Sequence, residues 1–459
     1  MSGVGSGTER ADMLAVQRPH AAGLDIGRDE IWVAVPEESA SESIRCFATY
    51  TPDLHALAKW LGECEIETVA MESTGVYWIP IYEILEARGF EVYLVNARHI
   101  KGVPGRKSDV QDCRWIQRVH TYGLLNGSFR PEAEMCTLRA YLRHRAQLVE
   151  HRAAHIQHMQ KALQQMNVQL QQVVSDITGV TGMAIMRAIV RGERDPNELA
   201  RFRAQGCAKS KAEIAKALAG HYQEEHVFVL KQALALYDTY TQQMVECDEE
   251  IERHFTALKP IHEDDLPPLD RSDKRDSHSK NGPAYDARGL LYQLLGVDLG
   301  AIPGLSDSTL PVILSETGID MSRFRTDKHF CSWLGLAPHN DISGGKVLRS
   351  RVPKTHNRAG QAFRLAAQSL SRGNSAYGAF FRRMRAKHGP KKAAVATAHK
   401  LARTFYYMLK YRKPYHHTDA ATYDQRTRHR QIAYLRKKAA QLGMTLVDAP
   451  IQPALAGSF

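Results

Sequence analysis

Four acidic residues near the start of the chain have the types and surroundings needed to bind a metal ion. They are Asp25, Glu72, Asp109 and Asp112. Each lies where a soluble domain normally hides an apolar side chain. Clustered buried carboxylates are costly unless a cation neutralises them. Oxygen ligands suit Mg²⁺ or Mn²⁺, which can assist phosphodiester cleavage. Taken singly, each residue could be a helix cap or a solvated turn residue, but the joint pattern favours a metal site.

The apolar runs around these residues predict strands. Residues 21–35, with a Gly-Arg-Asp turn in the middle, predict two antiparallel strands joined by a hairpin, so Asp25 lies near the end of a buried strand. Glu72 ends a further strand that begins at Thr68, and residues 92–95 predict another. Strands that alternate with helices up to about residue 125 indicate an α/β domain.

Helices are predicted after each of the last two of these strands. Residues 76–88 have helical spacing, and residues 108–122 predict a helix with Ser108 as its N-cap. Asp109 and Asp112 are three positions apart on that helix, so their side chains share a face. The second helix therefore presents two carboxylates together.

A basic region indicates nucleic-acid binding. Residues 341–440 contain 24 Lys and Arg but 3 Asp and Glu, whereas the net charge of the whole chain is +11. A charge run is often only a solvated face, but this one is interleaved with Phe and Tyr. Cations contact phosphates, and aromatic rings offer stacking surfaces for unpaired bases. Nucleic acid is therefore the expected partner of this region.

Size and cysteine usage indicate a soluble protein of several domains. The chain of 459 residues has length for about three domains. Seven scattered cysteines include no CxxC pair, which favours reduced thiols in a cytosolic compartment over disulfides or a zinc site. No apolar stretch approaches the roughly 20 residues that span a bilayer, and the first 18 residues lack a signal core. We therefore expect a cytoplasmic protein with no membrane partner.

The middle of the chain has two heptad stripes of apolar residues, at 149–177 and 227–258. These stripes predict long helices that pair with each other or with those of another subunit, joined through residues 180–210. We expect six segments in all: a disordered lead-in at 1–18, an α/β domain at 19–130, a coiled-coil helical domain at 131–259, a flexible linker or insertion at 260–290, a mainly helical C-terminal domain at 291–445, and a tail at 446–459.

One serine of the basic region could be a nucleophile. Ser343 precedes two glycines, so its hydroxyl is expected to be exposed, and the cations around it could hold a phosphate for attack. A turn serine with no chemical role is the alternative. Tyr406 and Tyr407 are also of a nucleophilic type, but their helical spacing and apolar neighbours favour structural positions.

The order of these segments resembles the DEDD-type insertion-sequence transposases, the insertion-sequence 110 family and its 1111 subgroup. The resemblance covers nearly the whole chain. It rests on six motifs: Leu24-Asp25-Ile26-Gly27; Met71-Glu72-Ser73-Thr74-Gly75-Val76-Tyr77-Trp78; Val95-Asn96-Ala97-Arg98 followed by Lys107-Ser108-Asp109 and Asp112; Ile302-Pro303-Gly304; Trp333-Leu334-Gly335-Leu336-Ala337-Pro338; and Ser343-Gly344-Gly345-Lys346.

This resemblance implies a ribonuclease-H-like (resolvase-like) N-terminal domain, a coiled-coil middle and a mainly helical C-terminal transposase domain. Asp25, Glu72, Asp109 and Asp112 would hold Mg²⁺ or Mn²⁺, and Ser343 would attack DNA and become covalently linked to it. The expected nucleic-acid contacts are basic residues near these motifs: Arg106, Lys107, Lys346, Arg349, Arg351, Lys354, Arg358 and Arg364.

The resemblance also implies the partners. A structured guide RNA (bridge RNA) from the element's non-coding end would pair with donor and target DNA. The protein would work as a tetramer, and each active site would combine the acidic domain of one subunit with the serine domain of another. Such a protein is bacterial and cytoplasmic, and is associated with the nucleoid when active. Base pairing would relieve the protein of reading base edges.

The sequence departs from the family pattern at two places, and three other functions are alternatives. Ser306 stands where the family often has a glycine, which weakens a phosphate-binding role for residues 302–306, and the charged segment 262–288 is longer than usual. A metal-dependent Holliday-junction resolvase-like nuclease would form no covalent intermediate. An actin-like sugar kinase would share residues 24–27 but needs further glycine-rich loops. A non-catalytic nucleic-acid-binding protein would not bind divalent metal.

Overall fold

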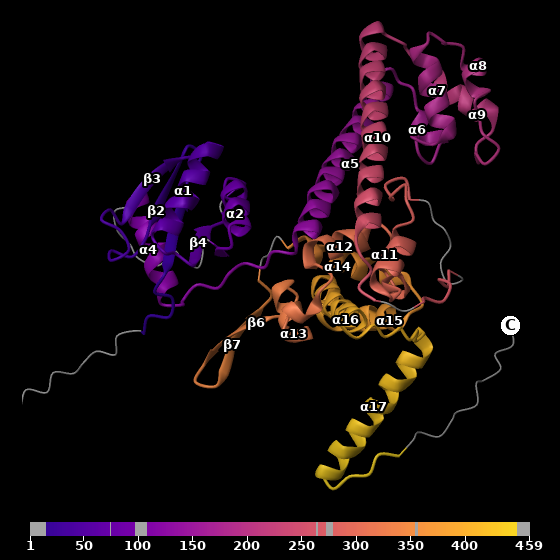
Figure 1. Ribbon diagram of the computed structural model, residues 1–459. Coiled ribbons are helices and arrows are strands. Elements are labelled where there is room, and N and C mark those ends of the chain that lie inside the picture. The colour runs from indigo at the N-terminus through magenta and orange to yellow at the C-terminus, as the bar shows by residue number, and fades with distance from the viewer. Residues whose placement is uncertain are drawn as a thin grey trace, which may run out of the picture. The chain divides into compact units, whose positions relative to one another are not determined.

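The chain forms two compact units that divide between Arg130 and Pro131. The computed structural model describes residues 15–73, 75–96, 108–262, 265–271, 279–353 and 357–447 (Figure 1). The expected lead-in and tail therefore lie largely outside the described residues. Among the helices of the described ranges, none has the length and apolar character needed to cross a bilayer.

The first unit is an α/β domain built on a five-stranded mixed sheet, as predicted. The strand order is β3-β2-β1-β4-β5, in which β1, β2 and β3 are antiparallel neighbours and β1, β4 and β5 are parallel neighbours. The elements are β1 (Ala21–Ile26), β2 (Glu30–Ala34), β3 (Ile44–Ala48), α1 (Thr51–Glu63), β4 (Thr68–Glu72), α2 (Trp78–Ala87), β5 (Glu91–Val95) and α4 (Asp109–Thr121).

The two faces of this sheet have separate cores. On one face, Leu24 and Met71 pack with Leu57 of α1 and Leu85 of α2 in the larger apolar cluster. On the other face, Ala70 and Val95 pack with Ile116 of α4 and with Leu125. The hydrophobic effect thus holds two helices against one face and α4 against the other.

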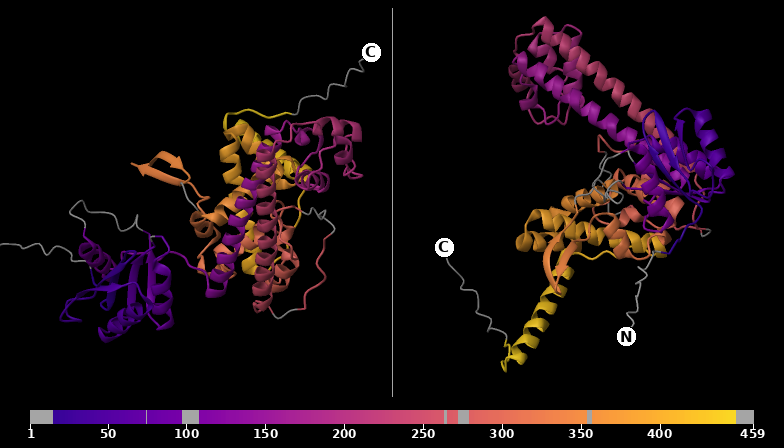
Figure 2. Two further views of the ribbon diagram at one scale, coloured as in Figure 1. Left: turned by 90° about the horizontal axis from the view of Figure 1, so that it is seen from above. Right: turned by 90° about the vertical axis from the view of Figure 1, so that its left-hand side faces the viewer.

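The second unit is mainly helical and contains a pair of long antiparallel helices, α5 (Ala133–Gln165) and α10 (Glu224–Ala257). Figures 1 and 2 show them side by side, which confirms that the two predicted stripes can pair within one chain. The prediction of a single helix that continues to Ile177 is wrong. Helix α5 ends at Gln165, and Asn167 adopts a left-handed backbone with φ +53°.

Four short helices follow this break and cap the end of the pair: α6 (Leu170–Val173), α7 (Val180–Val190), α8 (Pro196–Ala200) and α9 (Lys211–Leu218). Leu170 and Ile177, which continue the heptad spacing, are buried in the core of this cap with Met159 and Leu230. The apolar spacing therefore continues past the end of the helix, and residues 180–210 are partly helical where a simple connection was expected.

The rest of the second unit packs near the other end of the pair. Its elements are α11 (Ala287–Leu295), η1 (Leu299–Ala301), α12 (Thr309–Thr317), η2 (Met321–Arg323), α13 (Asp327–Trp333), β6 (His339–Ser343), β7 (Lys346–Arg351), α14 (Arg358–Ser369), η3 (Leu370–Arg372), α15 (Ala376–His388), α16 (Pro390–Tyr411) and α17 (Ala420–Gln441). The aromatic rings of Phe330, Phe363, Phe405 and Tyr406 form the centre of this part.

Part of the segment expected to be a flexible linker is bound to the helix pair. The buried Arg145 donates to the carbonyl oxygens of Asn281 at 3.1 Å and Gly282 at 2.7 Å, and Arg152 donates to that of Lys280 at 3.0 Å. Residues 280–282 are therefore held by side chains of α5, which a flexible connection would not be.

Candidate active site

Asp25 and Glu72 lie side by side on two neighbouring parallel strands. In the pairing of β1 with β4, Leu24 is opposite Met71, so the next residues along the strands, Asp25 and Glu72, are level with each other. Residues at the same level of a parallel pair point to the same face of the sheet. Both residues are half-buried. The sheet therefore brings these two predicted site residues together.

Helix α4 lies close against the same face because residue 23, two positions before Asp25, is a glycine. A Cβ at Gly23 would lie 2.2 Å from the backbone nitrogen of Gln117 and 2.6 Å from the carbonyl oxygen of Cys113. No side chain fits at those distances. Our sequence analysis gave Gly23 no separate role, and the available signal was its position two residues before a candidate carboxylate.

The direction of α4 brings its first turn to the ends of β1 and β4. The C-terminal half of α4 lies at the start of these strands, where Gln117 Nε2 donates to the Ala21 carbonyl oxygen at 3.3 Å and His120 Nε2 lies 2.9 Å from Thr68 Oγ1. Because the helix runs against the strands, its N-terminus lies at the strand ends that carry the first two carboxylates.

That first turn carries the other two predicted carboxylates. Ser108 caps the helix by accepting a hydrogen bond from the backbone nitrogen of Gln111 at 3.4 Å, which confirms the predicted N-cap. Asp112 is half-buried and Asp109 is exposed. The positive end of the helix dipole favours negative charge at both positions.

The negative charges of two of these carboxylates affect the pKa values of two cysteine thiols. Burial raises the pKa of the Cys113 thiol to about 11, and the negative charge of Asp25 contributes to the rise. Burial also raises the pKa of Cys46 on β3, with a larger contribution from Glu30 and a smaller one from Asp109. The negative charge of Asp25 therefore acts on α4, and that of Asp109 acts on β3.

The four carboxylates fit a divalent cation in chemical type. Carboxylate oxygens are the ligands that Mg²⁺ and Mn²⁺ prefer. Within the ranges that the structure describes, however, no three His, Cys, Asp or Glu side chains gather around one point that could hold a metal ion. The fit is thus one of residue chemistry. Two of the carboxylates come from strand ends and two from the first turn of α4.

Ser343 lies in the second unit, at the tip of a β-hairpin. It is the last residue of β6 and pairs with Lys346, the first residue of β7. Gly344 and Gly345 form the turn with φ +53° and +75°, which is the left-handed backbone that a two-residue hairpin turn requires and glycine favours. Ser343 is exposed, so this part of the prediction is confirmed.

The whole hairpin is exposed. Every residue of β6 and β7 is exposed, including Ile342, Val347 and Leu348, whose exposed fractions are 62%, 56% and 71%. Figures 1 and 2 show the two strands projecting from the helices of this unit. Apolar side chains exposed together on a projection are typical of a surface that binds another molecule.

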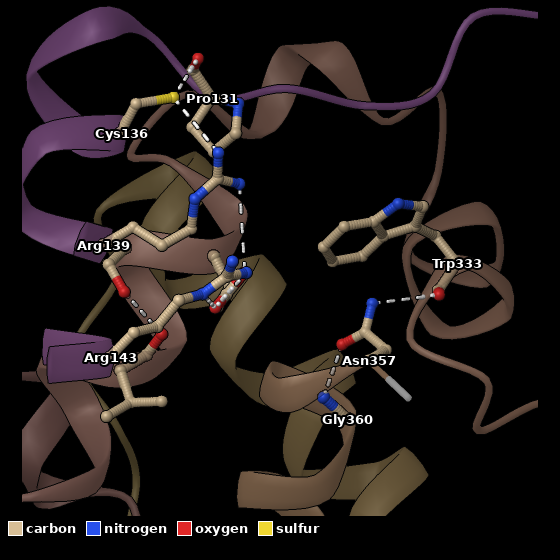
Figure 3. A network of polar contacts seen from close by, with 10 residues as sticks. Pro131, Cys136, Arg139, Arg143, Trp333, Asn357 and Gly360 are labelled. Atoms are coloured by element: carbon tan, nitrogen blue, oxygen red, sulfur yellow. Dashed lines mark hydrogen bonds and ion pairs between the residues drawn. The ribbon is translucent and has the colours of Figure 1, made fainter. Parts of the chain in front are cut away.

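The base of the hairpin is held to α14 by the Trp333–Pro338 motif. Asn357 Nδ2 donates to the Trp333 carbonyl oxygen at 3.3 Å, while its Oδ1 accepts from the backbone nitrogen of Gly360 at 2.8 Å (Figure 3). Arg364 Nη2 donates to the Gly335 carbonyl oxygen at 2.7 Å. These bonds make Asn357 both the N-cap of α14 and an anchor for the chain that enters β6.

A second network in Figure 3 was missed by the sequence analysis. Arg143 of α5 makes two hydrogen bonds, of 2.9 and 2.8 Å, to the buried carboxylate of Glu316 on α12, and Arg139 lies 3.9 Å from the same carboxylate. Arg143 and Glu316 are 173 positions apart in the sequence, and no local pattern indicates a partner at that separation. The network joins the helix pair to the part that carries the hairpin.

Of the five expected nucleic-acid contacts that the structure describes, four are exposed. Lys346, Arg349 and Arg351 lie on β7, and Arg358 begins α14. Arg364 is half-buried and bound to Gly335, which is a structural contact. Three further residues, Arg106, Lys107 and Lys354, lie outside the described residues, as do Thr74, Ala97 and Arg98 of the motifs.

Two other candidates have structural roles. Gly304 packs against α14, where a Cβ would lie 2.8 Å from the Ala366 carbonyl oxygen, and the backbone nitrogen of Ser306 donates to Thr309 Oγ1 at 2.8 Å instead of facing a ligand. Tyr406 is buried and donates to the Phe324 carbonyl oxygen at 3.0 Å. The interpretation of Tyr406 as a core residue is therefore confirmed.

Comparison with known protein families gives a match in each of the two units. A family model of DEDD transposases, described as "Transposase", matches residues 22–168, which include β1, β4 and α4. A model described as "Transposase IS116/IS110/IS902 family" matches residues 298–382, which include Ser343. No curated protein sequence matches the chain. The two matches together cover the segments that carry the carboxylates and the serine, and the chain belongs to the IS110 family of insertion-sequence transposases.

Proposed function

We propose that this transposase is an RNA-guided recombinase that cuts and rejoins donor and target DNA through a covalent phosphoserine intermediate, with the help of a divalent metal. The observation that carries the proposal is the strand register that sets Asp25 level with Glu72 on the sheet face covered by α4. The order of the five strands is compatible with a ribonuclease-H-like fold. Carboxylates at the ends of neighbouring strands are a suitable frame for metal-assisted phosphodiester chemistry.

In this proposal Asp25, Glu72, Asp109 and Asp112 hold Mg²⁺ or Mn²⁺. A bound ion would supply positive charge to the phosphate oxygens at the point of cleavage. The chain contributes two carboxylates from strand ends and two from the first turn of α4. The backbone N–H groups of that first turn also favour an anionic phosphate nearby.

The serine supplies the nucleophile. Ser343 Oγ forms a bond to phosphorus while the bond from phosphorus to the leaving DNA oxygen breaks, and the hydroxyl proton passes to that oxygen. A hydroxyl of the joining DNA strand then attacks the same phosphorus, the bond from phosphorus to Ser343 Oγ breaks, and the proton of the attacking hydroxyl passes to Oγ to restore the serine. The number of phosphodiester bonds is conserved, so rejoining needs no external energy source. Lys346 lies opposite Ser343 in the hairpin, and in this proposal it contacts the phosphate.

The partners follow from the resemblance described above. A guide RNA from the element's non-coding end would choose both DNA sequences by base pairing. A tetramer would bring the serine hairpin of one subunit to the carboxylates of another. The exposed Ile342, Val347 and Leu348 of the hairpin support a role in contact with another molecule.

The test is the formation of a covalent protein–DNA adduct. The full-length protein is incubated with RNA from the element end, a labelled DNA that carries the element junction, and Mg²⁺, and the products are separated on a denaturing gel. Ser343→Ala is compared with Ser350→Ala, a matched change of an exposed serine on the neighbouring strand. Asp25→Asn is compared with Asp29→Asn, whose side chain is 85% exposed in the adjoining turn.

We expect a protease-sensitive adduct that is lost in Ser343→Ala and Asp25→Asn and is kept in both controls. Cleavage without any adduct, unaffected by Ser343→Ala, would instead identify a metal-dependent resolvase-like nuclease. Adduct formation that persists without RNA would contradict RNA guidance and leave the serine chemistry in place.

A further inference from the structure

Helix α17 is a basic helix that the described part of the chain leaves almost uncovered. Its 22 residues include six Lys or Arg and a single acidic residue, Asp424. Among its side chains only Ala420 is buried. Its start is fixed to α15, because the backbone nitrogen of Ala376 donates to the Thr418 carbonyl oxygen at 2.9 Å. Figures 1 and 2 show the rest of the helix extending away from α15 and α16.

Cations from three helices gather where α17 leaves α15 and α16. The Lys400 ammonium of α16 lies 4.1 Å from the ring centre of Phe380 and 5.9 Å from that of Tyr423, and the Arg383 guanidinium of α15 lies 5.7 and 5.5 Å from the same two rings. Partial desolvation, and then the charges of Arg383 and Arg430, lower the pKa of Lys400. The three cations therefore share one region.

Within the described part of the chain, no ion pair joins Arg383, Lys400 or Arg430 to a carboxylate. Repulsion among them costs stability unless an anion binds. Cations already occupy positions over the Phe380 and Tyr423 rings, which makes these rings poor stacking surfaces for bases. The chemistry favours phosphates.

The same face continues along α17. Arg426 and Lys437 are four positions before and seven positions after Arg430, so all three lie on one face of the helix, together with Tyr423. All three basic side chains are exposed. Between Arg426 and Lys437 the helix rises about 16 Å, at about 1.5 Å per residue, which is several base pairs of a duplex.

We propose that Arg383, Lys400 and the Arg426, Arg430 and Lys437 face of α17 form a second nucleic-acid site, separate from the cutting residues, that binds the phosphate backbone of a duplex. This site lies beyond residue 382, where the second family match ends. It rests on the proposed function only in that the ligand is nucleic acid. The ligand chemistry is a phosphodiester backbone, which either DNA or paired RNA can supply.

The chain offers a matched pair of variants for the test. Arg426→Gln/Arg430→Gln/Lys437→Gln removes three charges from the proposed face. Arg428→Gln/Arg436→Gln/Lys438→Gln removes three charges from other faces of the same helix. Binding of a labelled duplex of random sequence, as DNA and as RNA, is measured by fluorescence anisotropy over a range of salt concentrations with the full-length protein. Circular dichroism checks that helix content is kept.

We expect the first variant to weaken binding on the order of tenfold at moderate salt and to reduce the slope of log K against log salt by about 3, since each phosphate contact contributes about 0.9. The control variant should change the slope by less than about 1. A larger effect on one duplex identifies the source of the phosphates. Equal effects of both variants would show that net charge alone matters and would overturn the proposal.

Two further measurements distinguish this site from a contact between protomers and from the cutting residues. If neither variant changes binding, while Leu435→Asp on the opposite side of α17 lowers the mass of the assembly in light scattering, the helix binds a second copy of the chain and the proposal is wrong. The slope is also measured in Ser343→Ala, where we expect the full wild-type value. Absence of the serine adduct together with the expected slopes would reject the recombination mechanism and retain this site.

Discussion

The Arg145 guanidinium makes two hydrogen bonds, of 2.5 and 2.9 Å, to the carboxylate of Asp248 inside the α5–α10 helix pair. Both side chains are almost fully buried. Asp248 also accepts a hydrogen bond from the backbone nitrogen of Ala284 at 3.0 Å, and Arg145 donates to two carbonyl oxygens of the same segment. One ion pair thus joins two helices and the chain that follows them.

Removal of the negative partner should destabilise the second unit. Asp248→Ala leaves a buried guanidinium without its counter-charge, and we expect a loss of about 3–5 kcal/mol in the free energy of unfolding. Chemical denaturation monitored by circular dichroism measures it. Asp238→Ala, which removes the partner of the half-exposed Arg187, should cost about 0–1 kcal/mol. Equal losses would contradict the central role of the buried pair.

A side chain at residue 23 should move α4 away from the sheet. In Gly23→Ala the Cβ would overlap the backbone at Gln117, and we expect a loss of about 1–3 kcal/mol and less divalent-ion binding. Gly62→Ala is the control, because a Cβ there meets nothing within 4 Å and alanine favours a helix. Titration with Mn²⁺ and thermal unfolding measure the two effects. Unchanged Mn²⁺ binding in a destabilised Gly23→Ala protein would separate the packing of α4 from the metal site.

The first unit should lose stability in mild acid because of His120. Burial, and then the charge of Arg18, lower the pKa of His120 from 6.5 to about 4. Between these two values the unfolded chain binds more protons than the folded one, so stability is full above about pH 6.5 and falls as the pH is lowered towards 4. The loss amounts to roughly 3 kcal/mol at about 1.4 kcal/mol per pH unit.

The measurement is the unfolding midpoint of the first unit from pH 7 to pH 4. His120→Gln, which keeps a group able to bond with Thr68, should flatten this dependence. His55→Gln, at an exposed histidine, should leave it as steep as in the wild type. A profile that stays steep in His120→Gln would assign the effect to other groups.

Asn357 should be needed for more than the stability of α14. Asn357→Asp keeps the oxygen that accepts from Gly360 but loses the nitrogen that donates to Trp333. We expect normal unfolding and a several-fold slower formation of the serine adduct. Asn357→Ala loses both bonds and should also cost about 1 kcal/mol as an N-cap. An adduct rate in Asn357→Asp equal to the wild type would show that the Trp333 bond does not position the hairpin.

Local features of the sequence predicted much of the first unit. The hairpin of β1 and β2, the strands β4 and β5 and the Ser108 N-cap follow from short runs and single residues, and the structure confirms each. The exposure of Ser343 followed from its two glycines, because only an open turn needs them together. These features depend on neighbours in the chain.

Features that depend on distant neighbours were missed. The register of Leu24 against Met71, which sets Asp25 beside Glu72, is decided by packing across the sheet. The small helical cap was hidden because buried residues of short helices repeat with the same three-and-four spacing as a continuous long one. The Arg143 contact with Glu316 joins residues that no local pattern relates.

The exposure of every residue in β6 and β7 has a consequence for the safety of the host cell. A two-stranded hairpin without a covering surface is only marginally stable in water. If Ser343 is the nucleophile, its hydroxyl takes up a fixed orientation only after another surface has bound the hairpin. A single protomer bound to chromosomal DNA would then be inactive, and assembly on the correct nucleic acids would activate it.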